Sequence, residues 1–370
     1  MFQAKHAMLP NATHDEFARE EFCATLRNVF TTELWPANRG VYDQLLPKYI
    51  AEHGHEPASF RDARDMMNHS LYWRATQLVG RTAQELLWDT VGESVERQLD
   101  DLNARAAQRP KKPLGSLRLN KKLQIPKYVA AVDIHVMPGN FQTELCDDDV
   151  FAGALYDRGV YVFSFGGLGP YNAGLGETMS SFIKSTFPKF KPLRILDIGC
   201  GPGFTTTAFV DAFPGAEVHA LDVGAPQVRY GHQRAESLGK RVHFSQQDGT
   251  QTDYADGSFD LVYSCLVTHE CPVPVIKALF RECHRLLKPG GMMIHDGASP
   301  KINDMGTQVM TSYFGHNINE PFSVGMSDLN YRDSFAEVGF PADTFFEGVR
   351  PPAYLKEQLK FVSYVGAFKR

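Results

Sequence analysis

The fold of this chain is decided by one stretch, Arg194-Ile195-Leu196-Asp197-Ile198-Gly199-Cys200-Gly201-Pro202-Gly203. Its first five residues are mainly apolar, with two β-branched isoleucines and one carboxylate, which is typical of a buried strand. Glycines at every second position then indicate a turn, and residues 205–213 carry apolar side chains at helical spacing. Glycine lets a backbone pass close to a ligand, and a helix N-terminus offers unpaired N–H groups. This strand–turn–helix therefore predicts the start of a nucleotide-binding α/β unit.

From residue 190 onward, predicted strands and helices alternate, which favours a parallel sheet covered on both faces. The predicted helices end at glycine or proline, as expected for helix C-termini. The last two strands are predicted to form a hairpin at the sheet edge. The predicted strands are 194–198, 217–221, 242–246, 259–264, 292–295, 344–348 and 361–368, and the predicted helices are 205–213, 226–238, 273–287 and 330–338.

The chain before residue 190 is expected to form two further regions. Residues 1–125 are predicted to be mainly helical, with one helix over 62–78 and another that starts at the capping-box pair Thr82 and Glu85. Its apolar face is expected to contain Leu87, Val91, Val95, Leu99 and Leu102. This domain is expected to serve packing, dimerisation or substrate cover. Residues 126–180 are predicted to be a connector and an aromatic, glycine-rich lid, and 181–370 the ligand-binding domain.

Composition excludes several classes of protein. The net charge of −5 over 370 residues gives no argument for nucleic acid or an anionic membrane as partner. No window is apolar enough for a membrane helix, and the first residues lack a signal core. The basic segment 109–127 is interpreted as a solvated connector. Six scattered cysteines are typical of reduced thiols, so we expect a cytoplasmic protein.

The glycine turn differs from the dinucleotide fingerprint G-x-G-x-x-G. Phe204 stands where that pattern needs its third glycine, which disfavours a pyrophosphate site. Asp222 ends the next predicted strand, where a carboxylate can accept both hydroxyls of a ribose. Asp248 follows the third predicted strand, where an acid can accept a hydrogen bond from an adenine amino group. We therefore expect a ligand with a ribose and without a diphosphate.

The glycine turn and the two acids are followed by residues 256–262 and 286–291, so a set of motifs stands in order along the chain. This set resembles class I S-adenosylmethionine-dependent methyltransferases, in the small-molecule branch similar to ubiquinone-biosynthesis enzymes. The resemblance covers about residues 190–300. It implies an α/β, Rossmann-like sheet, parallel with an antiparallel C-terminal hairpin strand, here joined to the helical N-terminal domain. The first 190 residues match no pattern of that family, so no substrate can be transferred from it.

The resemblance also implies roles for individual residues. The glycine turn should hold the methionine portion of S-adenosylmethionine, Asp222 the ribose and Asp248 the adenine. Cys265 and Leu266 should line the cavity near the sulfonium. The expected cofactor-binding residues are Asp197, Gly199, Cys200, Gly201, Gly203, Asp222, Val223, Asp248, Gly249, Cys265 and Leu266.

The acceptor side is expected at the carboxyl edge of the sheet, where open α/β sheets bind ligands. His269 and Glu270 follow the fourth predicted strand, and His295 ends the fifth. Histidine titrates near neutral pH and suits proton abstraction. His269 and His295, together with Glu270 beside His269, are therefore the candidate catalytic residues. The alternative for His269 is a structural role as a helix cap. Histidines 135, 269, 295 and 316 with Glu270 or Asp296 have no close metal-ligand spacing, and we expect no metal.

The predicted function is methyl transfer from S-adenosylmethionine to a small molecule, with S, O, N or C as acceptor atom. Three alternatives remain: a nucleic-acid or protein methyltransferase, a non-catalytic cofactor-binding subunit, and a nicotinamide oxidoreductase. The residues after the fourth strand, Ser264-Cys265-Leu266-Val267, lack the [DNS]-P-P-[YF] pattern of exocyclic-amine methyltransferases. We expect a small-molecule partner, no nucleic acid and no membrane, and the helical N-terminal domain favours a homodimer.

Overall fold

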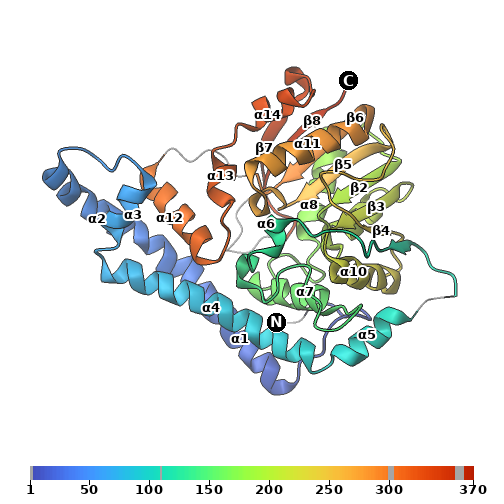
Figure 1. The fold of residues 1–370 in the computed structure, drawn as a ribbon, viewed down its shortest axis with the longest axis horizontal. Coiled ribbons are helices and arrows are strands. Elements are labelled where there is room, and N and C mark those ends of the chain that lie inside the picture. The colour runs from blue at the N-terminus through green and yellow to red at the C-terminus, as the bar shows by residue number, and fades with distance from the viewer. Residues whose placement is uncertain (1–2, 109–110, 299–303, 355–361) are drawn as a thin grey trace.

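The computed structural model describes residues 3–108, 111–298, 304–354 and 362–370. Their centre is an eight-stranded sheet in the order β1-β4-β3-β2-β5-β6-β8-β7, at the right of Figure 1. The strands from β1 to β6 run parallel, while β8 is antiparallel to both of its neighbours. The bounds are β1 Ser116–Arg118, β2 Arg194–Ile198, β3 Glu217–Asp222, β4 His243–Gln246, β5 Phe259–Cys265, β6 Leu287–Asp296, β7 Phe346–Arg350 and β8 Val362–Phe368. The predicted α/β class with its antiparallel hairpin is confirmed.

Strand β2 occupies the middle of the sheet because its side chains are buried on both faces. Leu196 and Ile198 face one core cluster and Ile195 faces another. After β2 the chain adds β3 and β4 on one side of this strand, and it then crosses over and adds β5 and β6 on the other side. The carboxyl end of β2 is therefore a topological switch point, where open α/β sheets form a ligand crevice.

Helices cover the sheet, and four of them lie within a residue or two of the predicted bounds, whereas the helix over Gly174–Thr186 was not predicted. They are α8 Gly174–Thr186, α9 Phe204–Ala212, α10 Ala225–Ser237, α11 Val273–Leu286 and α14 Tyr331–Glu337. Strand β6 departs most from prediction, because it begins at Leu287 and not at Met292. Its glycine pair was interpreted as a helix stop, but Gly290 N–H donates to Lys369 O at 2.7 Å and Lys369 N–H donates to Gly291 O at 2.9 Å. Residue 361 of the predicted last strand lies outside the described residues.

The N-terminal helices are α1 His14–Val29, the π-helical turn Phe30–Leu34, α2 Trp35–His53, α3 Phe60–Met67, α4 Leu71–Glu96 and α5 Leu99–Ala107. The predicted helix start at Thr82 is wrong, because the Ser70 side chain caps α4 and accepts from Trp73 N–H at 3.3 Å. The predicted helix over 62–78 is likewise interrupted between α3 and α4. All five residues of the predicted apolar face are buried, although they extend over α4 and α5.

The helix that follows β6 in the described chain packs against the N-terminal helices and away from the sheet. Figure 1 shows α12, Met305–Asn317, beside α2 and α3 and away from the strands. Val309 and Met310 of α12 are buried there with Tyr42 and Met67. The chain after the sheet therefore returns to the N-terminal helices, which brings segments far apart in sequence to one cluster. Short α13, Ser323–Ser327, follows α12, and a 3-10 turn at Ala342–Thr344 precedes β7.

The connector contains one strand that sequence analysis missed. Strand β1 pairs in parallel with β4, with Leu117 opposite Phe244. Only three residues pair, between prolines and lysines, so no local pattern predicts it. Arg118 forms an ion pair with Asp253 and Lys121 with Asp148, which neutralises part of the basic segment. Among the described helices, none has both the length and the apolar character that a bilayer crossing requires.

Candidate functional site

A cavity of about 560 Å³ lies at the carboxyl ends of β2, β3 and β5. Its wall takes residues from all three predicted regions, including Arg27 and Trp88 of the N-terminal helices and Tyr156 of α7, Phe151–Phe163. The volume is that of an ordinary small-molecule site. Nine of the predicted cofactor residues lie on the wall: Gly199, Cys200, Gly201, Asp222, Val223, Asp248, Gly249, Cys265 and Leu266.

The glycine turn adopts a backbone that other residues rarely take. Gly199, Gly201 and Gly203 have φ angles of 70°, 51° and 76°. A Cβ on Gly199 would lie 2.5 Å from Val267 Cγ2, and one on Gly203 would lie 2.8 Å from Phe244 Cζ. A Cβ on Gly201 meets nothing closer than Tyr156 Cε1 at 3.7 Å, so this glycine faces the open cavity. The turn therefore leaves a hollow that a side chain would fill.

Asp222 connects this turn to the end of β3. Its Oδ2 accepts from Gly201 N–H at 2.9 Å, and its Oδ1 accepts from Gly224 N–H at 2.8 Å. Burial raises the pKa of the carboxyl, while these backbone donors act in the opposite direction. Each oxygen keeps a second lone pair for a ligand hydroxyl. Asp222 is thus held at the cavity wall in a fixed orientation.

Asp197 lies behind the wall. It is 1% exposed, and its Oδ2 accepts from the Thr205 and Thr206 hydroxyls. Burial raises the pKa of Asp197 to about 7. Its Oδ1 is buried and, within the described residues, has no hydrogen-bond partner. Asp197 and Gly203 are the two predicted cofactor residues that do not reach the cavity, and Asp197 joins β2 to the first turn of α9.

Asp248 and Leu266 are two further predicted cofactor residues on the cavity wall. Asp248 Oδ1 accepts from Thr250 N–H at 2.8 Å and from its hydroxyl at 2.7 Å, which orients the carboxylate at the wall. Leu266 has a φ of 55°, an uncommon conformation for a non-glycine residue. Such strain persists only where surrounding structure imposes it, and it is frequent at functional sites.

Two histidines and two glutamates gather at the side of the cavity where the acceptor is expected, and His135, His269 and Glu270 lie on its wall. His269 and Glu270 lie in a 3-10 turn, Thr268–Glu270, directly after β5. His135, from the 3-10 turn Ile134–Val136, lies with its Nε2 2.8 Å from Glu270 Oε1. His269 Nε2 lies 3.1 Å from the same oxygen. On the other side, His135 Nδ1 is 2.9 Å from Glu320 Oε1.

These neighbours determine the charges at this end. Burial lowers the pKa of His135, but Glu270 and Glu320 outweigh it and raise that pKa to about 10. Burial likewise opposes protonation of His269, whose pKa Glu270 nevertheless raises. Burial favours the neutral acid of Glu270, yet the two histidines hold its pKa well below the usual range. The cluster is therefore strongly polar within an otherwise apolar cavity.

His295 does not face the cavity, contrary to the sequence-based expectation. It is fully buried, with Nδ1 2.7 Å from Ser264 Oγ and Nε2 2.8 Å from Thr268 Oγ1. Burial lowers its pKa to about 3. Successive strand residues point to opposite faces, and the neighbouring Asp296 is the one on the cavity wall. Because both ring nitrogens are occupied, His295 is not a candidate for catalysis.

The N-terminal helices contribute to the wall, in agreement with the expected role as substrate cover, but sequence reasoning did not single out Arg27. Arg27 of α1 is buried over the Phe163 ring, 3.3 Å from its centroid. Its Nε donates to Phe163 O at 3.1 Å and its Nη1 to Gln84 Oε1 at 3.0 Å. Burial lowers the pKa of Arg27 to about 9, so it stays charged at neutral pH. No carboxylate of the described chain lies within ion-pair distance of Arg27, and no local pattern announces this arrangement.

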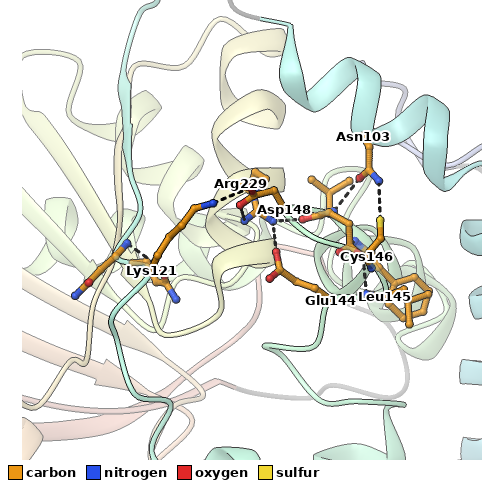
Figure 2. Close-up of polar contacts among 12 residues, drawn as sticks. Asn103, Lys121, Glu144, Leu145, Cys146, Asp148 and Arg229 are labelled. Carbon is orange, nitrogen blue, oxygen red and sulfur yellow. Dashed lines mark hydrogen bonds and ion pairs between the residues drawn. The ribbon is translucent and has the colours of Figure 1, made fainter.

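A polar network holds the predicted lid against the sheet domain. Arg229 of α10 donates to Glu144 Oε1 at 2.7 Å and to Asp148 Oδ1 at 3.2 Å (Figure 2). Lys121 of the connector binds Asp148 from the other side at 2.8 Å. Figure 2 also shows Asn103 of α5 joined to the same loop. The loop that leads into α7 is therefore tied to the connector, to α5 and to α10.

Comparisons with known proteins find methyltransferases as relatives of part of the chain. Residues 195–291 match the family described as "Methyltransferase domain". The chain is 32% identical over 136 residues to the malonyl-[acyl-carrier protein] O-methyltransferase of Pseudescherichia vulneris, over 36% of this chain and 51% of that protein. It is 30% identical over 177 residues to phosphoethanolamine N-methyltransferase 1 of Arabidopsis thaliana, over 46% of this chain and 35% of that protein. The chain thus spans about half the length, or less, of these curated relatives.

Among solved structures, phosphoethanolamine N-methyltransferase 2 of Haemonchus contortus, in complex with phosphomonomethylethanolamine and S-adenosylhomocysteine, aligns with a TM-score of 0.45 and 17% identity. That alignment covers 61% of this chain and 60% of the other. The family match spans the glycine turn, Asp222 and Asp248, which are the motifs that carry the resemblance in the sequence. Residues 195–291 therefore match a methyltransferase domain, in agreement with the resemblance to class I S-adenosylmethionine-dependent methyltransferases that the sequence motifs carry.

Proposed function

We propose that this protein transfers a methyl group from S-adenosylmethionine to a small molecule held in the same cavity. The observation that carries the proposal is that one cavity is lined by the glycine turn, Asp222 and Asp248, which we call the cofactor end, and also by His269 and Glu270, which we call the acceptor end. Cofactor and acceptor would therefore share one enclosed space, as in-line transfer requires.

The residues present fit this cofactor. The hollow at Gly201 admits backbone contact, and Asp222 offers a lone pair from each oxygen to the two ribose hydroxyls. Asp248 is oriented at the wall for the adenine. Bound S-adenosylmethionine supplies an activated methyl group, so the chain itself needs to align the acceptor and exclude water. Asp197 would act on the cofactor only through the turn that it supports.

His269 and Glu270 are the residues that we assign to the acceptor. Both line the cavity beyond Leu266, next to the strand end where the sulfonium is expected. An acceptor hydroxyl must lose its proton as it reacts, and this polar end is where the proton would leave it. His269 remains the best candidate of the three predicted catalytic residues, because His295 points away.

The walls indicate the class of acceptor. Trp88, Phe141, Tyr156 and Phe163 give the cavity a largely aromatic lining. Arg27 adds one buried positive charge whose direct contacts are neutral. Glu320 attracts Arg27 without forming an ion pair with it. A buried charge that has no direct ion-pair partner is costly, and an anionic ligand group lowers that cost. We propose an acceptor with an apolar or aromatic body and an acidic group that binds Arg27.

Two assays test this function. Calorimetric titration with S-adenosylhomocysteine and with NADH should show saturable binding of the first alone. Aromatic carboxylic acids should then quench the tryptophan fluorescence of the complex, and their methyl esters should not. In an Arg27→Met variant the acids should bind at least tenfold more weakly, since a charge-assisted hydrogen bond contributes about 1.5–3 kcal/mol. Arg350→Met is the matched control, because Arg350 also lies over an aromatic ring but is outside the cavity.

The proposal fails if NADH binds and S-adenosylhomocysteine does not. The acidic-acceptor part alone fails if acids and esters bind equally, or if both arginine variants weaken binding alike.

We further propose a cytoplasmic homodimer. The six thiols are all unpaired, in keeping with a reducing compartment. Phe22 of α1 and Leu71 and Leu78 of α4 are 61%, 74% and 68% exposed, and these are apolar side chains that a second copy would cover. Light scattering should then give twice the 41.4 kDa mass of the chain.

A further inference from the structure

The His–Glu cluster at the acceptor end brings together ligand atoms that are far apart in sequence. His135, His269 and Glu320 each offer one ligand atom, and these atoms lie within 4.8 Å of one another. They come from the turn Ile134–Val136, the turn Thr268–Glu270 and the segment after α12. Two imidazoles and one carboxylate are the donor set of many first-row metal sites that leave coordination positions open.

Glu270 determines which nitrogen of each ring is available. Its Oε1 makes a 2.8 Å hydrogen bond with His135 Nε2 and lies 3.1 Å from His269 Nε2 as an ion-pair contact, so the same nitrogen of both rings lies next to one carboxylate. The Nδ1 atoms are then left for another partner. Metal-bound histidines in proteins are almost always held in this way, with the second ring nitrogen donating to a carboxylate or carbonyl.

The Nδ1 side of His135 is close to a carboxylate but is not satisfied by it. His135 Nδ1 lies 2.9 Å from Glu320 Oε1, yet within the described chain it has no partner with hydrogen-bond geometry. Ligands about 2.1 Å from one metal ion lie roughly 3.0–3.5 Å apart, depending on the coordination angle. The Nδ1–Oε1 spacing is close to that range, and both side chains are only 16% and 14% exposed.

We propose that His135, His269 and Glu320 bind one divalent cation of the first transition series, such as Zn²⁺ or Mn²⁺, with Glu270 holding both rings. His135 and His269 lie on the cavity wall, so the open coordination positions face the acceptor. The proposal deepens the proposed function and rests on it for its role in catalysis. It assigns an oxygen acceptor, a phenol or other acidic hydroxyl, because a cation lowers the pKa of a hydroxyl that it binds.

The methyl transfer then balances without a further co-reactant. The hydroxyl bound to the cation loses its proton to water. Its oxygen forms the new bond to the methyl carbon, while the carbon–sulfur bond breaks and leaves its electron pair on sulfur. No oxidation or reduction takes place, so a redox-inert cation such as Zn²⁺ is sufficient.

Metal content tests the site directly. The full chain, stripped with chelator, incubated with Zn²⁺ or Mn²⁺ and desalted, should retain about one ion per chain by mass spectrometry. Co²⁺ in the same chain should give visible d–d absorption. Glu320→Gln and His135→Asn should each lower the retained metal at least tenfold. Glu217→Gln is the matched control, because Glu217 makes a 2.9 Å contact to His219 outside the cluster.

Binding of S-adenosylhomocysteine separates this proposal from the proposed function. It should stay within twofold of wild type in all three variants, since none of the substituted residues lies at the cofactor end. Wild-type protein that retains less than 0.2 ion per chain and gives no Co²⁺ absorption would overturn the metal site, as would variants that keep their metal. If a variant does not fold, the two wild-type measurements decide alone.

Discussion

Replacement of Asp222 by asparagine disturbs the hydrogen bonds that join the glycine turn to the end of β3 at the cavity wall. The carboxylate accepts from Gly201 N–H at 2.9 Å and from Gly224 N–H at 2.8 Å. An amide keeps one acceptor oxygen but turns an NH₂ group toward the other backbone donor and toward one ribose hydroxyl. Each lost hydrogen bond to a charged group is worth about 1.5–3 kcal/mol.

One such bond is lost inside the protein and one is lost to the ribose. The variant should therefore unfold about 1.5–3 kcal/mol more easily in urea, and it should bind S-adenosylhomocysteine roughly 10- to 150-fold more weakly by calorimetry. Asp260→Asn is the control. Asp260 Oδ2 also accepts from two backbone N–H groups, of Leu193 and Arg194 at 3.0 and 2.8 Å, but at the opposite end of the sheet.

The control should lose stability and keep its affinity. The reasoning is refuted if Asp222→Asn binds within twofold of wild type, or if Asp260→Asn loses as much affinity as Asp222→Asn does.

Further predictions concern the glycine turn and an N-terminal ion pair. Gly201→Val should lower S-adenosylhomocysteine affinity at least 100-fold, because a β-branched residue is strained at a φ of 51° and fills the hollow before Tyr156; a normal isotherm would contradict this. Glu16 binds Arg97 at 2.7 and 2.8 Å. The substitution Glu16→Gln should lower the free energy of unfolding by about 1 kcal/mol at pH 7, a modest value because Arg97 is half exposed. Arg97 lowers the pKa of Glu16 to about 2 in the folded state, so its stabilisation is present above about pH 4.5 and should fade toward pH 2 in urea titrations. A difference that is constant with pH would exclude this ion pair as the cause.

Local sequence predicts the cofactor end because its signals are local. The alternation of glycines dictates the turn, and Asp222 and Asp248 each follow directly on a strand. Both carboxylates and the turn therefore meet at one sheet edge, whatever the rest of the chain does. Strand β1 and the early start of β6 escaped prediction because each depends on a partner segment more than 70 residues away.

The acceptor end depends on contacts that no local pattern contains. His135, Glu270 and Glu320 meet across more than 180 residues of sequence. Arg27 reaches the cavity only because α1 packs near α7. His295 was assigned from its position at a strand end, but alternation along β6 turned Asp296 to the cavity and His295 to the core. Sequence alone does not determine which of two adjacent strand residues faces a crevice.

The central claim is that the cavity holds S-adenosylmethionine with its ribose on Asp222 and its sulfur toward His269. A crystal structure of the full chain with S-adenosylhomocysteine tests this most directly. The account predicts both ribose hydroxyls within hydrogen-bond distance of the Asp222 carboxylate, and the adenine beside Asp248. A ligand bound elsewhere on the chain, or in the cavity with its ribose away from Asp222, would contradict it.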